Sequence, residues 1–247
     1  MKAFFFLIVL LSIVFNSYSQ SRNIHPTSLR WVGFVGRYSI TPEWTIHTRI
    51  DNRRFINPNK QNQFIAHLYI ARKVFEQSEL GLGITHSRQS PQNIHSTSTL
   101  VVPEWRVFQD FASEKQCCKL KILHKYRIEE RFLRKNNGKE LTDGYSFQMR
   151  FRYRIQLSYP LVKNPEKYWM LRVYDEVMIN AGKGIVRNVF DQNRIFVGLE
   201  HKFATHWAAE LGYMKLFQQQ SSGVDFLARD IFRLSIIHIY PKNNLRG

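Results

Sequence analysis

The segment from Tyr145 to Leu157 alternates strictly between apolar and polar residues, and no other feature of the chain restricts its fold as strongly. Seven apolar or aromatic residues occupy the odd positions, and the six residues between them are all polar, three of them Arg. A period of two is typical of a β-strand, whereas a helix would scatter these residues around its circumference. The segment therefore predicts a strand with one apolar face and one strongly hydrated face.

Alternating runs recur along nearly the whole chain, and we count eleven of them. They span residues 29–40, 44–53, 63–73, 79–86, 99–109, 119–132, 145–157, 168–180, 194–203, 206–217 and 228–240. No convincing amphipathic helix interrupts them. Because bacterial single-chain membrane barrels have an even number of strands, we expect ten or twelve, with the miscount at the amino end or between Asp110 and Cys118.

Strands of this kind cross a bilayer without any long hydrophobic run, since a transmembrane strand needs only about 9 to 11 residues and is apolar on one face. Short links, such as residues 41–43 and 204–205, alternate with longer polar ones, such as residues 87–98 and 181–193. Short turns on one side and long loops on the other are typical of outer-membrane barrels. The sequence therefore predicts an all-β fold, a transmembrane antiparallel β-barrel of about 10 to 12 strands.

The amino end has the three-part pattern of a secretory signal. Lys2 precedes an apolar run from Ala3 to Phe15, and small residues stand three and one before a predicted cleavage between Ser19 and Gln20. The run stops well short of the roughly 20 apolar residues that a spanning helix needs. We therefore expect a cleaved signal peptide at residues 1–19, a barrel domain at residues 20–247, and location in the outer membrane of a Gram-negative cell.

Aromatic residues make up 14% of the chain, and many lie near the ends of the predicted strands. Trp and Tyr are favoured at the level of the lipid headgroups because their rings are partly apolar and partly hydrogen-bonding. We interpret this set as interfacial girdles, with ordinary core packing as the alternative. Its members are Trp31, Tyr38, Trp44, Trp105, Tyr126, Tyr145, Trp169, Trp207 and Tyr240.

The net charge of +17 would favour a nucleic-acid partner in a cytosolic protein, but predicted export argues against that partner. The basic residues are spread over strand faces and loops, without a phosphate-binding loop, zinc spacing or basic helix. Anionic lipopolysaccharide at the loops and anionic solutes inside the barrel remain open as partners. Outer-membrane lipids and the barrel-assembly machinery follow from the predicted location, and the oligomeric state is left open.

The polar positions of three predicted strands form a basic ladder. Each Arg side chain that faced lipid at the bilayer midplane would cost about 2 to 4 kcal/mol. We therefore expect these side chains to point into the lumen, beside carboxylates in the same phase. The ladder consists of Lys125, Arg127, Arg131, Arg150, Arg152, Arg154 and Arg172, and its acidic partners are Glu129, Glu176, Glu200 and Glu210. A salt-bridge network that merely fills the lumen is the interpretation we favour slightly over an open bore.

Four segments carry a resemblance to a known family. They are Leu123 to Phe132 (LHKYRIEERF), Tyr145 to Tyr153 (YSFQMRFRY), Tyr174 to Glu176 (YDE) and Phe190 to Arg194 (FDQNR). Together they resemble domain of unknown function 2490, from about Trp31 to Tyr240. The resemblance implies an outer-membrane β-barrel, chiefly of Bacteroidota, and brings no activity or catalytic residue. The chain departs from the usual barrel ending, because seven residues follow the last aromatic, Tyr240.

Catalytic and metal sites find weaker support. His86 and Ser87 are adjacent at the start of a long loop, and His95 and Ser96 lie across it, but adjacency alone provides neither a base within reach nor an oxyanion site. The vicinal pair Cys117 and Cys118 is interpreted as turn residues, because a disulfide between neighbours is hard to form. We expect no catalytic residue, no metal and no cofactor, and leave enzymatic activity undecided but disfavoured.

Function is therefore left among four alternatives. The leading one is a structural or binding barrel that recognises anionic envelope molecules through its basic lumen or its loops. A narrow anion-preferring channel, a lipid-modifying enzyme and a soluble periplasmic β-sandwich are the others.

Overall fold

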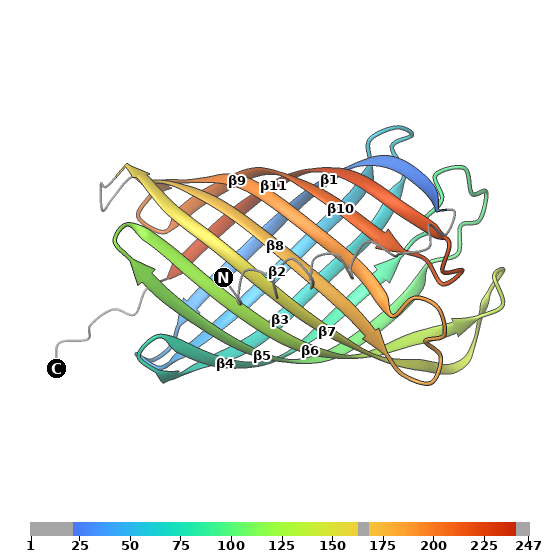
Figure 1. Ribbon diagram of the computed structural model, residues 1–247, viewed down its shortest axis with the longest axis horizontal. Coiled ribbons are helices and arrows are strands. Elements are labelled where there is room, and N and C mark those ends of the chain that lie inside the picture. The colour runs from blue at the N-terminus through green and yellow to red at the C-terminus, as the bar shows by residue number, and fades with distance from the viewer. Residues whose placement is uncertain (1–21, 163–167, 241–247) are drawn as a thin grey trace, which may run out of the picture.

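A computed structural model describes residues 22–162 and 168–240, and these residues form one closed β-barrel (Figure 1). The strands are β1 (Asn23–Ser39), β2 (Trp44–Phe55), β3 (Gln61–Phe75), β4 (Ser78–Gln89), β5 (Val102–Cys117), β6 (Leu120–Asn136), β7 (Leu141–Val162), β8 (Trp169–Ala181), β9 (Phe190–Ala204), β10 (Trp207–Gln219) and β11 (Asp225–Tyr240). The all-β prediction is confirmed. A β-sandwich is excluded, because the strands form a single closed sheet rather than two packed layers.

The count of eleven strands is confirmed, and the expectation of an even number is wrong. Consecutive strands pair antiparallel, and the barrel closes through a parallel pair of β1 and β11, from Asn23 beside Asp225 to Tyr38 beside Tyr240. When the number of strands is odd, the first and the last strand run in the same direction. Parallel strands also form a ladder of hydrogen bonds, so these two strands pair and the sheet closes without a free edge. The suspected miscount after Asp110 does not exist, because β5 simply continues to Cys117.

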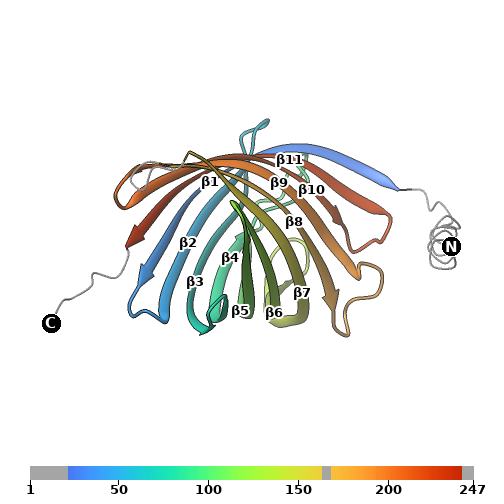
Figure 2. The ribbon, with the colours of Figure 1, turned by 60° about the vertical axis from the view of Figure 1, so that its left-hand side comes forward.

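Because the number of strands is odd, the start of β1 and the end of β11 lie at opposite ends of the barrel (Figures 1 and 2). The links at residues 40–43, 76–77, 118–119 and 205–206 meet at one end, together with Tyr240, and we call this the short-turn end. The links at residues 56–60, 90–101, 137–140, 182–189 and 220–224 meet at the other end, together with Asn23, and we call this the long-loop end.

The predicted alternation is present in three dimensions. On β7, Phe147 and Phe151 are exposed on the outside, while Arg150 between them is only 4% exposed inside the barrel. The same inversion runs around the sheet, so the exterior carries exposed Ile, Leu, Val and Phe side chains while Arg, Glu and Asp are buried. Among the described residues, no helix is long and apolar enough to span a membrane.

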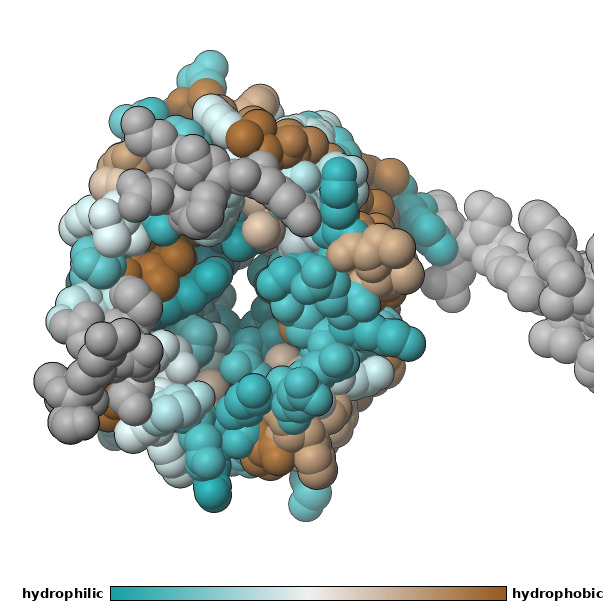
Figure 3. All heavy atoms as spheres, turned by 90° about the vertical axis from the view of Figure 1, so that its left-hand side faces the viewer, coloured by the Kyte–Doolittle hydropathy of each residue, from teal (hydrophilic) through white to brown (hydrophobic). Residues whose placement is uncertain are grey.

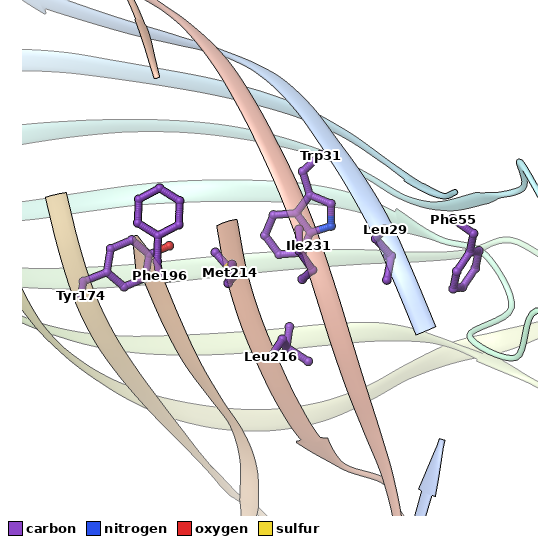
Figure 4. Packing of buried hydrophobic residues seen from close by; sticks show 8 residues of the cluster. All are labelled: Leu29, Trp31, Phe55, Tyr174, Phe196, Met214, Leu216 and Ile231. Carbon is purple, nitrogen blue, oxygen red and sulfur yellow. The ribbon is translucent and has the colours of Figure 1, made fainter. Parts of the chain in front are cut away.

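A cluster of apolar side chains from β1, β2 and β8 to β11 also lies inside the barrel (Figure 4). Its members are Leu29, Trp31, Phe55, Tyr174, Phe196, Met214, Leu216 and Ile231. Gly198 and Gly212 make room for Phe196, since a Cβ on either glycine would lie 2.4 Å from its ring. Placing Trp31 in an interfacial girdle is therefore wrong: its alternation phase turns it inward, where it is 3% exposed.

Candidate functional site

The barrel encloses a cavity of about 870 Å³ that reaches the surface at the short-turn end. Pro42, Glu43 and Gln77 line its mouth, and it extends inward to Trp31 and Arg150. Figure 3 looks onto this end and shows hydrophilic side chains around a central hollow. A cavity of this size lies within the range of about 300 to 1,000 Å³ that is usual for small-molecule sites.

The predicted basic residues come together on three neighbouring strands. Lys125, Arg127 and Arg131 lie on β6, the three arginines at positions 150, 152 and 154 lie on β7, and Arg172 lies on β8. The register aligns Arg127 with Arg152 and Lys125 with Arg154, so the cationic positions of β6 and β7 are direct neighbours. We call the inward faces of β6, β7 and β8 the cationic wall.

Two of the predicted carboxylates bind the arginines of β7. Glu129 accepts a hydrogen bond of 2.8 Å from Arg150 Nε, and it also pairs with Arg152. Glu176 lies 2.8 Å from Arg152 and 3.2 Å from Arg154. Both carboxylates are almost completely buried, so each offsets the desolvation cost of more than one guanidinium.

The other two predicted carboxylates bind cations beside the cavity mouth. Arg172 Nη1 lies 2.5 Å from Glu200 and 3.0 Å from Glu210, and Arg233 lies 3.0 Å from Glu210. Tyr168 donates a hydrogen bond of 2.7 Å to Glu200. Burial, followed by the neighbouring Glu200 carboxylate, raises the pKa of Tyr168 to about 12, so the phenol keeps its proton and remains a donor.

Sequence reasoning missed half of the carboxylates that are buried inside the described barrel, namely Asp51, Glu104, Asp110 and Asp191. Arg131 binds none of the predicted carboxylates, and its partner is Glu104 at 2.6 Å, which also binds Arg106 at 2.7 Å. Asp110 binds Lys125 at 2.8 Å and also Arg127. The signal was present, because Glu104, Arg106 and Asp110 share one phase of the alternation on β5.

Among the described residues, the cations that face the interior or line the cavity outnumber the carboxylates that do so. The cations are Arg37, Arg49, Arg53, Lys73, Arg106, Lys121, Lys125, Arg127, Arg131, Arg150, Arg152, Arg154, Arg172, Arg194, Arg229 and Arg233. The carboxylates are Glu43, Asp51, Glu76, Glu79, Glu104, Asp110, Glu114, Glu129, Glu176, Asp191, Glu200 and Glu210. The interior of the described barrel therefore carries a net positive charge, which raises the local concentration of anions.

The strands β10, β11 and β1 contribute most of the apolar lining of the cavity. Met214 on β10, Ile237 on β11 and Val35 on β1 line it beside the charged residues Glu210, Arg233 and Arg37 of the same strands, and we call the apolar residues on the inward faces of β10, β11 and β1 the apolar wall. In the ring of eleven strands, β7 lies across the barrel from β1. The cavity is thus lined mainly by charged side chains on β6, β7 and β8 and by both apolar and charged side chains on β10, β11 and β1.

The link between β4 and β5 lies over the interior at the long-loop end. Ile94 packs against the apolar cluster, and Lys60 Nζ donates a hydrogen bond of 3.0 Å to the Ile94 carbonyl. Arg229 donates one of 3.0 Å to Gln92 and has no carboxylate partner among the described residues. Residues of this loop therefore cover part of the barrel interior at the end opposite the cavity mouth.

The histidine and serine pairs considered for catalysis are not assembled. His86 faces outward, with its ring centroid 4.5 Å from that of Trp105, whereas Ser87 faces inward and donates a hydrogen bond to Glu104. Cys117 and Cys118 are free, exposed thiols at a short turn. In the described part of the chain, no group of His, Cys, Asp and Glu is arranged to hold a metal ion.

A comparison with protein families finds a match to the family described as "Protein of unknown function (DUF2490)", over residues 30–227. The match confirms the resemblance seen in the four segments of the sequence. No curated protein matches the chain.

Proposed function

The chain belongs to the DUF2490 family of proteins of unknown function, and from its geometry we propose that it is an outer-membrane β-barrel whose basic interior binds an anion. One observation carries the proposal, the inversion of polarity across the sheet. Buried arginines line the inside, and exposed hydrocarbon covers the outside. A water-soluble protein would be expected to bury that hydrocarbon, because large exposed apolar surfaces are rare outside interfaces with lipid or protein.

Strand length supports membrane insertion. The shortest strands have 12 residues, which exceeds the roughly 9 to 11 that a tilted transmembrane strand needs. Aromatic side chains lie outward near both ends, with Trp169 and Trp207 at the short-turn end and Tyr145 at the long-loop end. The proposed signal peptide at residues 1–19 lies outside the described residues, and export remains part of the proposal.

The long-loop end is the side we assign to the cell exterior, since long loops face outward in outer-membrane barrels. Outward-facing arginines lie toward that end, with Arg54, Arg88 and Arg134 near the ends of their strands and Arg30 beside Arg54. They support lipopolysaccharide phosphates as a surface partner, because Arg forms bidentate hydrogen bonds with phosphate. Assembly by the barrel-assembly machinery follows from the same proposal.

A narrow anion-preferring channel is the second candidate, and the cationic excess beside an open mouth is the observation that favours it. We rank it below binding because paired Arg and Glu side chains fill much of the interior and a loop lies over the long-loop end. A lipid-modifying enzyme has less support, because His86 and Ser87 point to opposite faces of β4.

Reconstitution of the mature chain in lipid vesicles and planar bilayers tests the proposal. If the barrel binds an anion without forming an open channel, we expect the protein to float with the vesicles through a density gradient and to produce no stable conductance steps. Failure to float would contradict membrane insertion. Stable conductance steps with an anion-selective reversal potential would favour the channel over the binding barrel. In that case the triple variant Arg150→Gln, Arg152→Gln, Arg154→Gln should lower the anion selectivity.

A further inference from the structure

Two arginines lie directly opposite each other on the outer surface of the barrel, toward the long-loop end. The register pairs Arg30 of β1 with Arg54 of β2. Both face outward, because their neighbours Leu29 and Arg53 are buried inside the barrel. Like charges at directly opposite positions of a sheet repel each other, so this arrangement is unfavourable in the absence of an anion.

The link between β2 and β3 holds the two guanidinium groups together through neutral acceptors. Asn59 Oδ1 accepts a hydrogen bond of 3.0 Å from Arg30 Nη2 and one of 2.8 Å from Arg54 Nε. Arg54 also donates to the Asn59 carbonyl and to Gln61 Oε1, both at 3.0 Å. The shared acceptor keeps the two guanidinium groups close together before a ligand binds, and amide oxygens leave both positive charges without a counterion.

Neither arginine has a carboxylate partner in the described part of the chain. Asp51 on β2 faces inward, and the outward-facing Asp230 on β11 binds Lys215 at 2.7 Å. Arg30 is exposed, and its only hydrogen bond to a described residue is the one to Asn59. Most of the N–H donors of Arg30 therefore stay free for a ligand.

Exposed hydrocarbon begins beside the two arginines, on the side toward the short-turn end. The next outward-facing residue of β1 is Val32, which is 49% exposed, and Ile50 on β2 is 46% exposed. Under the proposed function this hydrocarbon contacts acyl chains, so the two guanidinium groups lie at the level of the lipid headgroups. Arg suits that level because it binds phosphate through two parallel hydrogen bonds.

We propose that Arg30 and Arg54 together bind one phosphate group of an anionic membrane lipid, whose acyl chains lie along Val32 and Ile50. A phosphate monoester fits better than a diester, because its charge of about −1.5 to −2 at neutral pH matches two guanidinium groups. This inference rests on the proposed function, since it assigns the surface phosphate partner to one pair of arginines and to one class of phosphate.

Native mass spectrometry of the mature chain in a neutral detergent tests the inference with three lipids that have the same acyl chains. Dioleoyl phosphatidic acid is a phosphate monoester, dioleoyl phosphatidylglycerol is a diester, and dioleoyl phosphatidylcholine has no net charge. We expect the first phosphatidic acid to bind at least ~10-fold tighter than phosphatidylcholine, which corresponds to about 1.4 kcal/mol, and phosphatidylglycerol to lie between them. Equilibrium dialysis in the same detergent measures the binding of inorganic phosphate.

Three variants and one matched control assign the binding to this pair. Arg30→Gln and Arg54→Gln should each weaken phosphatidic acid binding about 10-fold. Arg54→Lys should weaken it less, because it keeps the charge and loses the two parallel donors. Arg88→Gln should leave it unchanged, because Arg88 faces outward at the same end but lies opposite Phe64 and Pro103 rather than another cation. Far-ultraviolet circular dichroism and the electrophoretic mobility of the folded form establish that each variant is folded.

Each outcome decides for or against the inference. Equal binding of the three lipids by the folded barrel, or an equal loss in Arg88→Gln and Arg54→Gln, would overturn the phosphate site and leave the membrane proposal intact. Inorganic phosphate that binds as tightly as phosphatidic acid, and that Arg30→Gln weakens, would show a site for the free anion instead of the lipid. Phosphate bound in the interior would not respond to Arg30→Gln, because Arg30 faces outward. Failure of the mature chain to float with lipid vesicles would contradict the proposed function itself.

Discussion

The cationic wall and the apolar wall of the barrel line one cavity, yet they are built by opposite means. On β7, arginines alternate with outward-facing aromatics, and their charges are balanced in part by Glu129 and Glu176. On β10 and β11, Met214, Leu216 and Ile231 fill part of the interior with hydrocarbon, beside the ion pair of Glu210 with Arg233. The cationic wall depends on specific ion pairs and the apolar wall on shape and volume, so the two walls should respond differently to substitution.

Glu129→Gln should produce the largest loss of stability. The side chain of Glu129 is fully buried and pairs with Arg150 and Arg152, so neutralising it leaves buried cations without their counterion. Removing one partner of a buried pair costs about 3 to 5 kcal/mol. The measurement is equilibrium urea unfolding in lipid vesicles, followed by tryptophan fluorescence.

Glu130→Gln provides the matched control for that substitution. Glu130 is the next residue of β6, faces outward, and is contacted by Gln109 at 3.4 Å. We expect its free energy of unfolding to change by no more than about 0.5 kcal/mol. Equal effects at the two positions would contradict an interior held together by ion pairs.

Met214→Ala should cost about 3 kcal/mol, because it leaves a void at a buried position within the apolar cluster. Met214→Leu, which conserves volume, should cost less than about 1.5 kcal/mol. Leu211→Ala removes an outward-facing side chain of the same strand, and lipid can fill the space that it leaves. A loss at position 211 as large as that at position 214 would argue against a packed interior and would remove the contrast between the walls.

Trp31 on β1 and Arg53 on the neighbouring β2 bring an apolar and a charged side chain together, and their coupling should be the smallest of the three effects. The Arg53 guanidinium lies 3.7 Å from the centre of the Trp31 ring in a buried setting. A double-mutant cycle with Trp31→Leu and Arg53→Gln should give a coupling energy of about 2 kcal/mol, as expected for a desolvated cation–π pair.

The outward-facing pair Trp44 and Arg72 is the control for that cycle. The same two residue types lie 5.4 Å apart there, and Arg72 is exposed. Its coupling energy should be about 0.5 kcal/mol. Similar values for the two cycles would mean that the interior does not strengthen the interaction.

The two walls also differ in how far the sequence predicts them. The cationic wall follows from the alternation, since each inward position between Tyr145 and Leu157 is polar and each outward position is apolar. Trp31 lies inward and Val32 outward on β1, and both are hydrophobic, so their sequence gives no contrast between the faces. Where both faces of a strand are apolar, the sequence therefore does not predict which residues face the interior until the register of the strands is known.

For a related reason, the sequence does not predict which charged residues pair with each other. Arg131 meets Glu104 because β5 and β6 pair with Glu104 opposite Leu133, a register that depends on the whole sheet. The prediction of an even number of strands was wrong for a different reason, because it came from the strand numbers of other barrels rather than from these residues. Nothing in strand chemistry prevents β1 and β11 from closing the sheet in parallel.

Accessibility of the two barrel ends on intact cells tests most directly the claim that this barrel spans the outer membrane. Cys117 and Cys118 lie at the short-turn end, and Lys139→Cys in a Cys117→Ser, Cys118→Ser background places a single thiol at the long-loop end. A maleimide joined to a large polymer should label position 139 on intact cells, and the native cysteines only after the outer membrane is permeabilised. Labelling of both ends, or of neither, before permeabilisation would contradict a spanning barrel with its long loops outside.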